Sequence, residues 1–599
     1  MRSHTAQHLR RLLVGVVAGC ALGLTQAEAP RAIPAPFLIA PMIEGLGYCA
    51  EGARAPTIAQ AHAHCAAQAN PSAAPLRQLL DALEPGGAHG AVHLGYTVGI
   101  NLLGFARSAD FQAHLRRLQA LIDTVQRPVV LYLMGNHFAE PAADGAPDAA
   151  SLMRFADQSI PKDNYFYSSI RPWTLRQSPD LWIVQRRRQA LAALGSWYQE
   201  LPATLRQRIV AMTLAGELHQ LYPDFAHGLG QFDAVRLTDY SPGTVADFQA
   251  WLSERYQGRI DALNRAWTTA WPNFSAIQPP SKDLHRQALQ HITDHLDSHA
   301  HGTLIVEGWL ASLPAGHQVE LRLNGRWLGV ADYGLSRQDV YEAVPAVRDA
   351  SVGFRYGLDF SHLPRGIHTL QVVLRGPKTA YELARRRLVV MGQTQNPVAA
   401  FTTPSDLPAP PKDLQFWLDR PRDQQDLYFN PAAKDWYAFR QHQVRQALIA
   451  WFDDARAVGL PAAKLYSHQI ASAMVGGWNP LLTASDSSLH GPTPYRKGVN
   501  LYGGALNMAL LRQRYLGPGE SFAVPEFHTQ SWKDPQAPLR TLQALRQARA
   551  DFVVPYFMTL YPDALIAKNN PHDAFRIAPD NPRYGSNRLY AAIRELVRQ

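Results

Sequence analysis

The sequence predicts an α/β protein: a (β/α)8 TIM barrel interrupted by an inserted all-β sandwich. Three observations lead to this fold class. Apolar strand-like segments alternate with amphipathic helix-like segments as far as residue 295. Short strand-like segments without helices fill residues 296–395, and the alternation resumes from residue 434. Four candidate strands before the insert and four after it make eight, the number of a TIM barrel.

Residues 1–29 are typical of a bacterial export signal: a basic stretch, a short apolar stretch and a small, polar end. Two processing routes stay open, lipidation of Cys20 or cleavage after Ala27. We therefore expect a periplasmic protein, an outer-membrane lipoprotein or a secreted protein, with membrane contact only through a lipid on Cys20. In an exported chain, Cys49 and Cys65 are expected to form a disulfide.

The first part of the barrel is predicted over residues 33–295. Its candidate strands are 36–45, 91–100, 128–136 and 208–217, and a long loop occupies 137–180. Residues 111–125 and 181–201 read as helices, and the apolar residues of 244–267 fall on one helical face.

The insert is predicted over residues 296–395, with Asn324-Gly325 as a hairpin turn, and a proline-rich linker follows over 396–433. The second part of the barrel is predicted over residues 434–599. Its candidate strands are 463–471, 498–506, 520–528 and 551–561, with helices at 435–457 and near 504–515, 537–549 and 587–598.

Two glutamates end predicted strands, Glu217 the fourth and Glu526 the seventh. Active sites of TIM barrels lie at the carboxyl ends of the strands, so the two carboxylates are expected to share one pocket. Glycoside hydrolysis needs such a pair, one protonated and one ionised. Glu217 is expected to be exposed at the mouth of a cleft and partly protonated, through apolar walls and the charge of its partner. The alternative is a salt-bridged structural glutamate, which is the commoner role of one strand-terminal Glu.

Other polar and aromatic residues at or after strand ends are candidate substrate contacts. We expect no metal, because the histidines have no ligand spacing, and no cofactor. The +9 net charge is spread along the chain without a nucleic-acid-binding motif, so carbohydrate is the expected partner and nucleic acid is not. The candidate contacts are Asn136, His137, His219, Tyr222, His468, Gln469, Trp478, His528, Trp532, Tyr556 and Tyr561.

Residues 247–271 (DFQAWLSERYQGRIDALNRAWTTAW) resemble the segment that follows the acid/base strand in family 42 β-galactosidases of glycoside hydrolase clan A. Residues 434–452 are similar to the helix that resumes the barrel in that family. The resemblance implies a retaining mechanism, with Glu217 as acid/base and Glu526 as nucleophile. The chain departs from the family at Gly216, where clan A usually has an asparagine that binds the sugar 2-hydroxyl.

Two weaker resemblances point elsewhere. GELHQLYP (216–223) is similar to a β-amylase stretch, which implies an inverting mechanism. The insert resembles a β-sandwich module of exopolysaccharide and glycosyltransferase-associated proteins in RQDV (337–340) and VGF (352–354), with a structural spacer as the alternative.

The expected function is therefore retaining hydrolysis of β-glycosidic bonds in an envelope or extracellular glycan. A non-catalytic glycan-binding or polysaccharide-assembly protein is the alternative that Gly216 favours. Transglycosylation would use the same residues, and the oligomeric state stays open.

Overall fold

The computed structural model describes residues 36–599, apart from residues 50–51, 53–54, 56, 66–67, 69–70, 88–89, 105–107, 136–137, 140–148, 166–167, 221–231, 234, 393–398, 504–506, 563–564 and 566–570. The predicted export signal with Cys20 lies outside the described residues. Residues from Phe37 to Gln599 belong to one structural unit. No described helix is long and apolar enough to cross a membrane.

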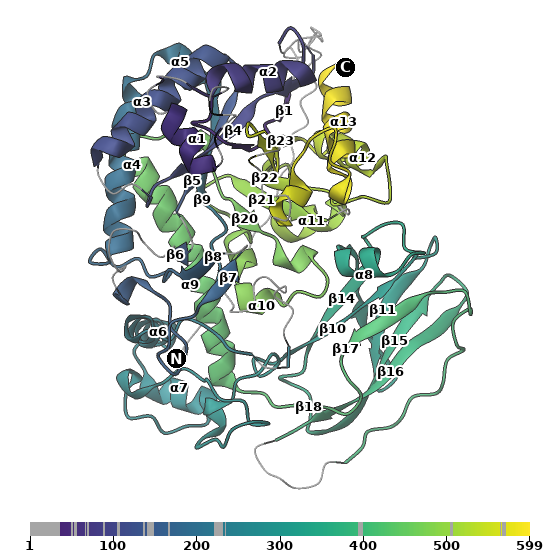
Figure 1. Ribbon diagram of the computed structural model, residues 1–599. Coiled ribbons are helices and arrows are strands. Elements are labelled where there is room, and N and C mark those ends of the chain that lie inside the picture. The colour runs from purple at the N-terminus through teal and green to yellow at the C-terminus, as the bar shows by residue number, and fades with distance from the viewer. Residues whose placement is uncertain are drawn as a thin grey trace, which may run out of the picture. The chain divides into compact units, whose positions relative to one another are not determined.

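Parallel strands form two sheets at the centre of this unit (Figure 1). The first sheet has the order β20 (Gln469–Ile470), β21 (Lys497–Tyr502), β22 (Phe522–His528), β23 (Ala550–Pro555), β1 (Phe37–Ile39) and β3 (Val92–Leu94). The second has the order β19 (Leu465–Tyr466), β9 (Ile209–Ala215), β5 (Val129–Met134) and β4 (Tyr96–Asn101). These strands fall on the eight predicted segments, which confirms an α/β protein with parallel sheets.

The two sheets share chain segments at both of their ends. Only Gly95 separates β3 from β4, and only Ser467 and His468 separate β19 from β20. Isolated parallel bridges continue the pairing near each junction. These bridges join Met42 to Thr97 and Tyr466 to Arg496.

Side chains on the two faces of the parallel strands belong to separate hydrophobic clusters. In β5, Val129, Leu131 and Leu133 belong to the large cluster that also contains residues of the covering helices. The intervening Val130 belongs to a small cluster shared with residues of β1, β9, β19, β22 and β23. Burial on both faces explains why these strands appear in the sequence as continuous apolar runs.

Helices alternate with the parallel strands along the chain. They are α1 (Ile58–Cys65), α2 (Ala73–Leu83), α3 (Ser108–Val125), α4 (Trp182–Glu200), α5 (Ala203–Arg208), α6 (Pro242–Arg255), α7 (Ile260–Trp267), α9 (Pro431–Ala457), α10 (Pro480–Thr483), α11 (Met508–Tyr515), α12 (Ala537–Gln547) and α13 (Ser586–Val597). Short strands lie outside the two parallel sheets. They are β2 (Ile43–Glu44), β6 (Phe138–Ala139), β7 (Asp163–Tyr165), β8 (Ser168–Pro172) and β24 (Met558–Thr559). Of these, β6, β7 and β8 fall within residues 137–180, where a loop was expected.

Residues 244–267, expected on one helical face, form two helices rather than one. α6 ends at Arg255 and α7 begins at Ile260. Between them Gln257 and Gly258 have φ angles of 55° and 70°, in the left-handed region that ends a helix. Buried residues of both helices still share one cluster with α9, so the predicted apolar face is kept.

Residues 303–427 form two further sheets that are largely antiparallel. One has the order β13 (Asp332–Leu335), β14 (Gly353–Asp359), β10 (Thr303–Leu310) and β17 (Phe416–Arg420). The other has the order β12 (Arg326–Val330), β11 (Gln318–Leu323), β15 (Gly366–Arg375), β16 (Ala380–Val390) and β18 (Gln425–Leu427). Residues of both sheets share one buried hydrophobic cluster.

Two details of this region differ from the sequence expectation. A short helix, α8 (Gln338–Ala343), lies among strands where no helix was expected. β17 and β18 lie within residues 396–433, the expected linker, and they pair with β10 and β16. The inserted sheets therefore continue to Leu427.

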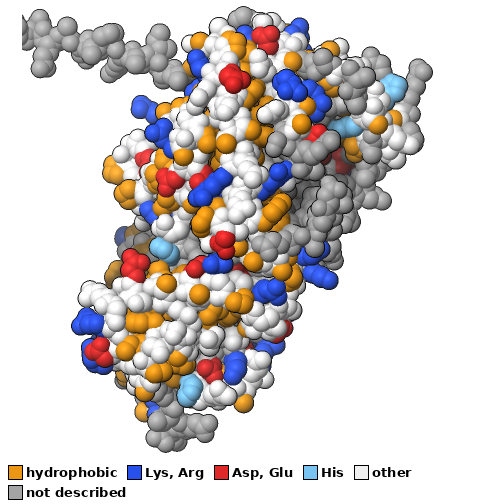
Figure 2. All heavy atoms as spheres, turned by 90° about the vertical axis from the view of Figure 1, so that its left-hand side faces the viewer, with side chains coloured by type: hydrophobic (Ala, Val, Ile, Leu, Met, Phe, Trp, Pro, Cys, Tyr) orange, Lys and Arg blue, Asp and Glu red, His pale blue; other side chains and the backbone are white. Residues whose placement is uncertain are grey.

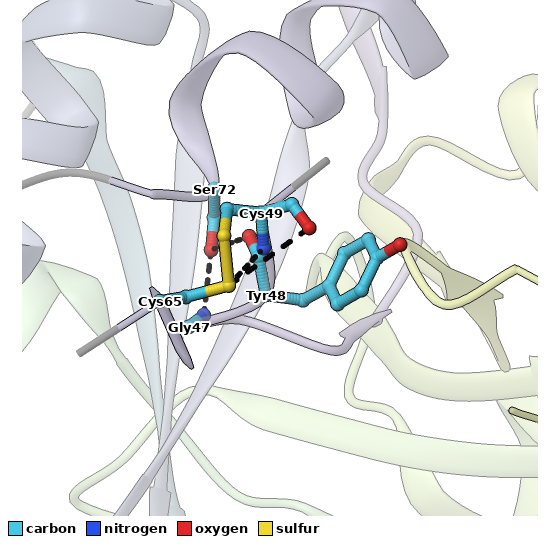
Figure 3. Close-up of a disulfide and its surroundings, with 5 residues drawn as sticks. All are labelled: Gly47, Tyr48, Cys49, Cys65 and Ser72. Carbon is cyan, nitrogen blue, oxygen red and sulfur yellow. Dashed lines mark hydrogen bonds between the residues drawn. A yellow bond between two sulfur atoms is a disulfide. The ribbon is translucent and has the colours of Figure 1, made fainter. Parts of the chain in front are cut away.

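The predicted disulfide between Cys49 and Cys65 is confirmed (Figure 3). It joins the segment after β2 to the last residue of α1, with the two Cα atoms 5.7 Å apart. Beside it, Ser72 Oγ accepts a hydrogen bond from the Gly47 amide over 2.6 Å. The disulfide thus ties α1 to the segment that follows β2.

Charge is distributed over the surface rather than concentrated. On the described part of the face shown in Figure 2, basic, acidic and hydrophobic side chains are interspersed. This agrees with the spread of positive charge along the sequence.

Candidate active site

The turn after β9 places Glu217 through two residues in left-handed conformations. Ala215 has a φ of 66° and Gly216 a φ of 96°. A Cβ atom at position 216 would lie 2.5 Å from the hydroxyl oxygen of Tyr132, a residue of β5. Glycine is therefore required here by both the backbone and the space, and the Tyr132 hydroxyl fills the place that a side chain at 216 would take.

Glu217 is buried beside polar side chains of β21. It is 7% exposed, so the expected exposure at the mouth of a cleft is not observed. Asn500 Nδ2 donates a hydrogen bond to Glu217 Oε1 over 2.7 Å, and the Tyr502 hydroxyl lies 3.5 Å from the same oxygen. Burial and then the charge of Glu526 raise the pKa of Glu217 to about 8, against the opposing hydrogen bonds from Asn500 and Tyr502.

Glu526 lies on β22, and a histidine orients it. Its side chain is 15% exposed, and His468 Nε2 donates to Glu526 Oε2 over 3.0 Å. His468 Nδ1 lies 3.1 Å from Thr213 Oγ1, within hydrogen-bond distance. The Tyr132 ring stacks on His468 with 4.1 Å between centroids. Tyr132 thus packs on His468, which binds Glu526, and its hydroxyl lies beside Gly216, the residue before Glu217.

The two carboxylates are close enough for the charge of Glu526 to raise the pKa of Glu217. Glu217 is the more buried of the two, and the negative charge of Glu526 beside it opposes its ionisation, because like charges in a poorly hydrated site repel. At neutral pH the pair therefore offers one proton donor and one anion, a combination suited to acid-assisted displacement at an acetal carbon.

Residues 172–301 match glycoside hydrolase family 42. That family is described as beta-galactosidase. The matched residues include Glu217 and the 247–271 segment, whereas Glu526 lies outside them. The match confirms the predicted resemblance to family 42 and supports the predicted enzyme class, a glycoside hydrolase.

Among solved structures, the chain is similar to the catalytic domain of beta-amylase from Paenibacillus polymyxa, with 15% sequence identity and a TM-score of 0.27. The similarity covers 42% of this chain and 55% of that one, so it spans just over half of the relative's length. No curated protein matches the chain.

The match to family 42 does not say which residues other than the two glutamates would contact a sugar. Asn136, His137 and Tyr222 lie outside the described residues. His468 contacts Glu526, and the buried Gln469 follows it on β20 with its side-chain amide unpaired among the described residues.

Two predicted histidine contacts are buried. Burial lowers the pKa of His219 to about 4, so this ring is neutral at physiological pH. His528 is fully buried, with Nε2 3.0 Å from the Ser586 hydroxyl and Nδ1 accepting from the Gln530 amide. Burial also lowers the pKa of His528 to about 3. Both ring nitrogens of His528 thus have hydrogen-bond partners within the protein.

The predicted aromatic contacts are dispersed. The Tyr561 hydroxyl lies 2.8 Å from His62 Nε2, near the disulfide. Tyr556 packs edge-on against Phe557. Trp532 is 38% exposed and packs edge-on against Tyr341 of α8. Trp478 is half-buried and lies in the loop between β20 and β21.

Sequence reasoning missed four residues that the structure brings to the carboxylates. They are Tyr132, Thr213, Asn500 and Tyr502, all on the parallel strands. Asn500 and Tyr502 alternate along β21 and so point to the same face, a period-two signal that polar residues in an apolar strand provide. In the part of the chain that the structure describes, no three His, Cys, Asp or Glu side chains are grouped to hold a metal ion.

Proposed function

We propose that this protein is a retaining glycosidase that cleaves β-glycosidic bonds of an exported oligo- or polysaccharide. The observation that carries this proposal is the rise in the pKa of Glu217 through burial and the charge of Glu526. The strand order supports a closed eight-stranded barrel as the scaffold, because the two parallel sheets share segments at both ends. We further propose that the two antiparallel sheets are a β-sandwich inserted in that barrel.

In the first step, Glu526 attacks the anomeric carbon while Glu217 donates its proton to the leaving oxygen. The covalent ester removes the negative charge of Glu526. One of the two causes that raise the pKa of Glu217 is then lost, so its pKa falls and Glu217 stays ionised, able to accept the proton of the attacking water. Water attacks the anomeric carbon, the ester bond breaks, and Glu526 recovers its charge.

His468 holds Glu526 for this attack. Its Nε2–H binds one carboxylate oxygen and leaves the other free for the sugar carbon. On the far side of the ring, the Thr213 hydroxyl lies 3.1 Å from Nδ1 and helps to hold the imidazole in place. Asn500 orients the Glu217 carboxyl through Oε1.

The direct test is kinetic, with nitrophenyl β-D-galactoside as the first substrate because the matched family is described as beta-galactosidase. Glu526→Gln should lower kcat at least about 10³-fold with the fold intact by circular dichroism. In the wild type, kcat/KM should fall as pH rises above about 8, where Glu217 loses its proton. Proton NMR of the first-formed sugar should show retention, and inversion would instead favour the β-amylase-like mechanism. Full activity of Glu526→Gln refutes the assignment.

A glycan-binding protein without catalysis is the second candidate, and Gly216 is the feature that favours it. The Tyr132 hydroxyl lies where the side chain of a residue at 216 would be, so a polar group is still present at that point. Binding of β-linked oligosaccharides by calorimetry, with no product after long incubation, would support this candidate.

Export is also a proposal. Mass spectrometry of the mature protein would distinguish a lipid on Cys20 from cleavage after Ala27.

A further inference from the structure

The inserted sheets contact the loops that follow three neighbouring parallel strands, β20, β21 and β22. Asn500 lies on β21, Glu526 lies on β22, and His468 is the residue before β20. The insert therefore lies against the same end of the parallel strands as the candidate active site. The contacts are a bridge between Ser336 and Val475, a 2.8 Å hydrogen bond from Asn507 to the Tyr333 carbonyl, and a 3.1 Å hydrogen bond from Gln338 to the Gln530 carbonyl.

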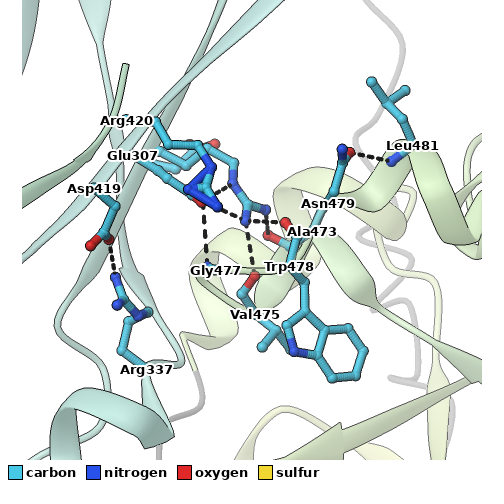
Figure 4. A network of polar contacts seen from close by, with 12 residues as sticks. Glu307, Arg337, Asp419, Arg420, Ala473, Val475, Gly477, Trp478, Asn479 and Leu481 are labelled. Carbon is cyan, nitrogen blue, oxygen red and sulfur yellow. Dashed lines mark hydrogen bonds and ion pairs between the residues drawn. The ribbon is translucent and has the colours of Figure 1, made fainter. Parts of the chain in front are cut away.

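A buried ion pair of the insert binds the first of these loops, and Figure 4 shows Glu307 of this pair beside Gly477 of the loop. Arg355 on β14 and Glu307 on β10 are 6% and 1% exposed, and Arg355 Nη2 donates to Glu307 Oε2 over 2.8 Å. The same guanidinium donates to the main-chain oxygens of Trp478 (2.7 Å), Val475 (3.0 Å) and Ala473 (3.4 Å). A guanidinium has five donors in a rigid plane, so one side chain fixes three points of the loop.

The other end of this loop reaches the segment that carries Glu217. The main-chain amide of Gln220 donates to the carbonyl oxygen of Thr483 over 2.7 Å. Arg440 of α9, which is 1% exposed, donates to two carbonyl oxygens of α10. Residues 473–483 are thus held by the insert at one end and by α9 and the Glu217 segment at the other.

Trp478 lies between these two anchors. Its main-chain oxygen is held by Arg355, whereas its indole ring points away from Glu307 and Arg420 (Figure 4). A flat apolar ring with a polar edge is suited to packing against a sugar. A tryptophan on a free loop would lose part of that binding energy to ordering the loop, and the ion pair removes this cost in advance.

We propose that Arg355 is a positioning residue, through which the inserted sheets hold Trp478 as a sugar-contacting wall of the candidate active site. The insert would then be part of the substrate site rather than a spacer. This proposal rests on the proposed function, because it requires a glycan as the ligand.

The test uses the double substitution Glu307→Gln and Arg355→Met in the full chain. Both charges are removed because breaking a buried pair on one side only leaves an unpaired charge that itself destabilises the fold. The matched control is Glu320→Gln with Arg322→Met, which removes an ion pair within β11, where Arg322 Nε donates to Glu320 Oε1 over 2.9 Å.

We expect hydrogen–deuterium exchange of peptides from residues 472–483 to become about tenfold faster in the double variant and to stay unchanged in the control. KM for a β-linked galacto-oligosaccharide should rise about tenfold with kcat changed less than about twofold, because binding is weakened while the carboxylates stay in place. In a Trp478→Ala background, the same double substitution should add nothing further to KM.

Unchanged exchange or unchanged KM in the double variant overturns the positioning role, as does an equal effect in the control. If the wild type neither cleaves nor binds any β-linked oligosaccharide, galactosides first, the proposed function fails and the sugar-contacting role of Trp478 fails with it. Exchange at residues 472–483 still decides, in that case, whether Arg355 holds the loop.

Discussion

At the scale of single residues, the site depends on placing two carboxyl groups in unlike surroundings. Glu217 is buried and receives a hydrogen bond from Asn500, while Glu526 is more exposed and is bound by His468. Burial favours the neutral acid, and hydrogen bonds from histidine and solvent favour the anion. The proposed roles of acid and nucleophile therefore follow from the surroundings, since both side chains are the same.

We expect Glu526→Gln to lower the pKa of Glu217. The Glu526 charge is the second cause of its rise to about 8, after burial, so its removal should move the pKa down while burial keeps it above 4.5. Carbon-13 NMR of labelled glutamate carboxyls measures this directly. The control is Glu520→Gln, which removes a carboxylate paired with Lys497 and should leave Glu217 unchanged. An unchanged pKa in Glu526→Gln would show that the two carboxylates are not coupled.

The same pKa has a consequence for stability. A carboxyl whose pKa is higher in the folded than in the unfolded state binds its proton more tightly in the folded state. For Glu217, stability is therefore greatest below about pH 4.5 and declines as the pH rises from there towards 8. This cost of burying an acid is characteristic of a residue kept for chemistry rather than for folding.

Gly216→Ala should destabilise the fold more than a matched glycine substitution. Alanine at a φ of 96° is strained, and its Cβ would also lie 2.5 Å from the Tyr132 hydroxyl. Gly258 is the control, because it has a φ of 70° and no atom within 4 Å of the added Cβ. We expect a loss of about 1 kcal/mol for Gly258→Ala and a further ~1–3 kcal/mol for Gly216→Ala, measured by urea unfolding.

Adding Tyr132→Phe to Gly216→Ala should recover part of the extra loss in the free energy of unfolding. The second substitution removes the clashing oxygen and leaves the strain of the positive φ in place. If Gly216→Ala and Gly258→Ala cost the same, the Tyr132 hydroxyl does not fill the space at 216.

At the scale of elements, the parallel strands were predictable because burial on both faces makes each an apolar run bounded by polar residues. The break between α6 and α7 was not, since the apolar spacing continues across it and only Gly258 marks the left-handed turn. β17 and β18 were hidden in a proline-rich stretch, because pairing with the edges of existing sheets stabilises them rather than their own sequence.

The site divides in the same way. Glu217 and Glu526 could be proposed as a pair from the sequence because the topology of parallel strands brings strand ends together. Tyr132 and Thr213 were not, because their role depends on which ring stacks on His468 and which hydroxyl faces its Nδ1. Such pairwise contacts have no spacing in the sequence that could reveal them.

The disulfide should stabilise the element it ties down, α1. Cys49 and Cys65 are 16 residues apart, and closing a loop of that length lowers the entropy of the unfolded chain. Replacing both cysteines by alanine should reduce the free energy of unfolding by about 3 kcal/mol. Chemical denaturation with and without reductant measures this: the wild type should lose stability on reduction, and the variant should not respond. Equal stability of the oxidised wild type and the variant would contradict the prediction.

At the scale of the whole molecule, the inserted sheets and the parallel-stranded part are joined by more than the two chain crossings. The Glu307–Arg355 pair is almost fully buried at their contact, and Arg514 pairs with Asp332 across it. If the two parts separated, the Arg355 guanidinium would lose its hydrogen bonds to the carbonyl oxygens of residues 473–478, and Arg514 would lose Asp332, which costs free energy in both parts. The two parts are therefore coupled in stability.

We expect the described unit, residues 37–599, to unfold in one cooperative transition. Far-ultraviolet circular dichroism, which follows the backbone, and tryptophan fluorescence, which follows packing, should give coincident urea curves. In the Glu307→Gln, Arg355→Met variant the coupling is weakened, so the two curves should separate, whereas the Glu320→Gln, Arg322→Met control should keep them together. Separate transitions already in the wild type would mean that the inserted sheets fold independently, and the Arg355 hydrogen bonds to the loop would then be a contact between two domains rather than part of one folding unit.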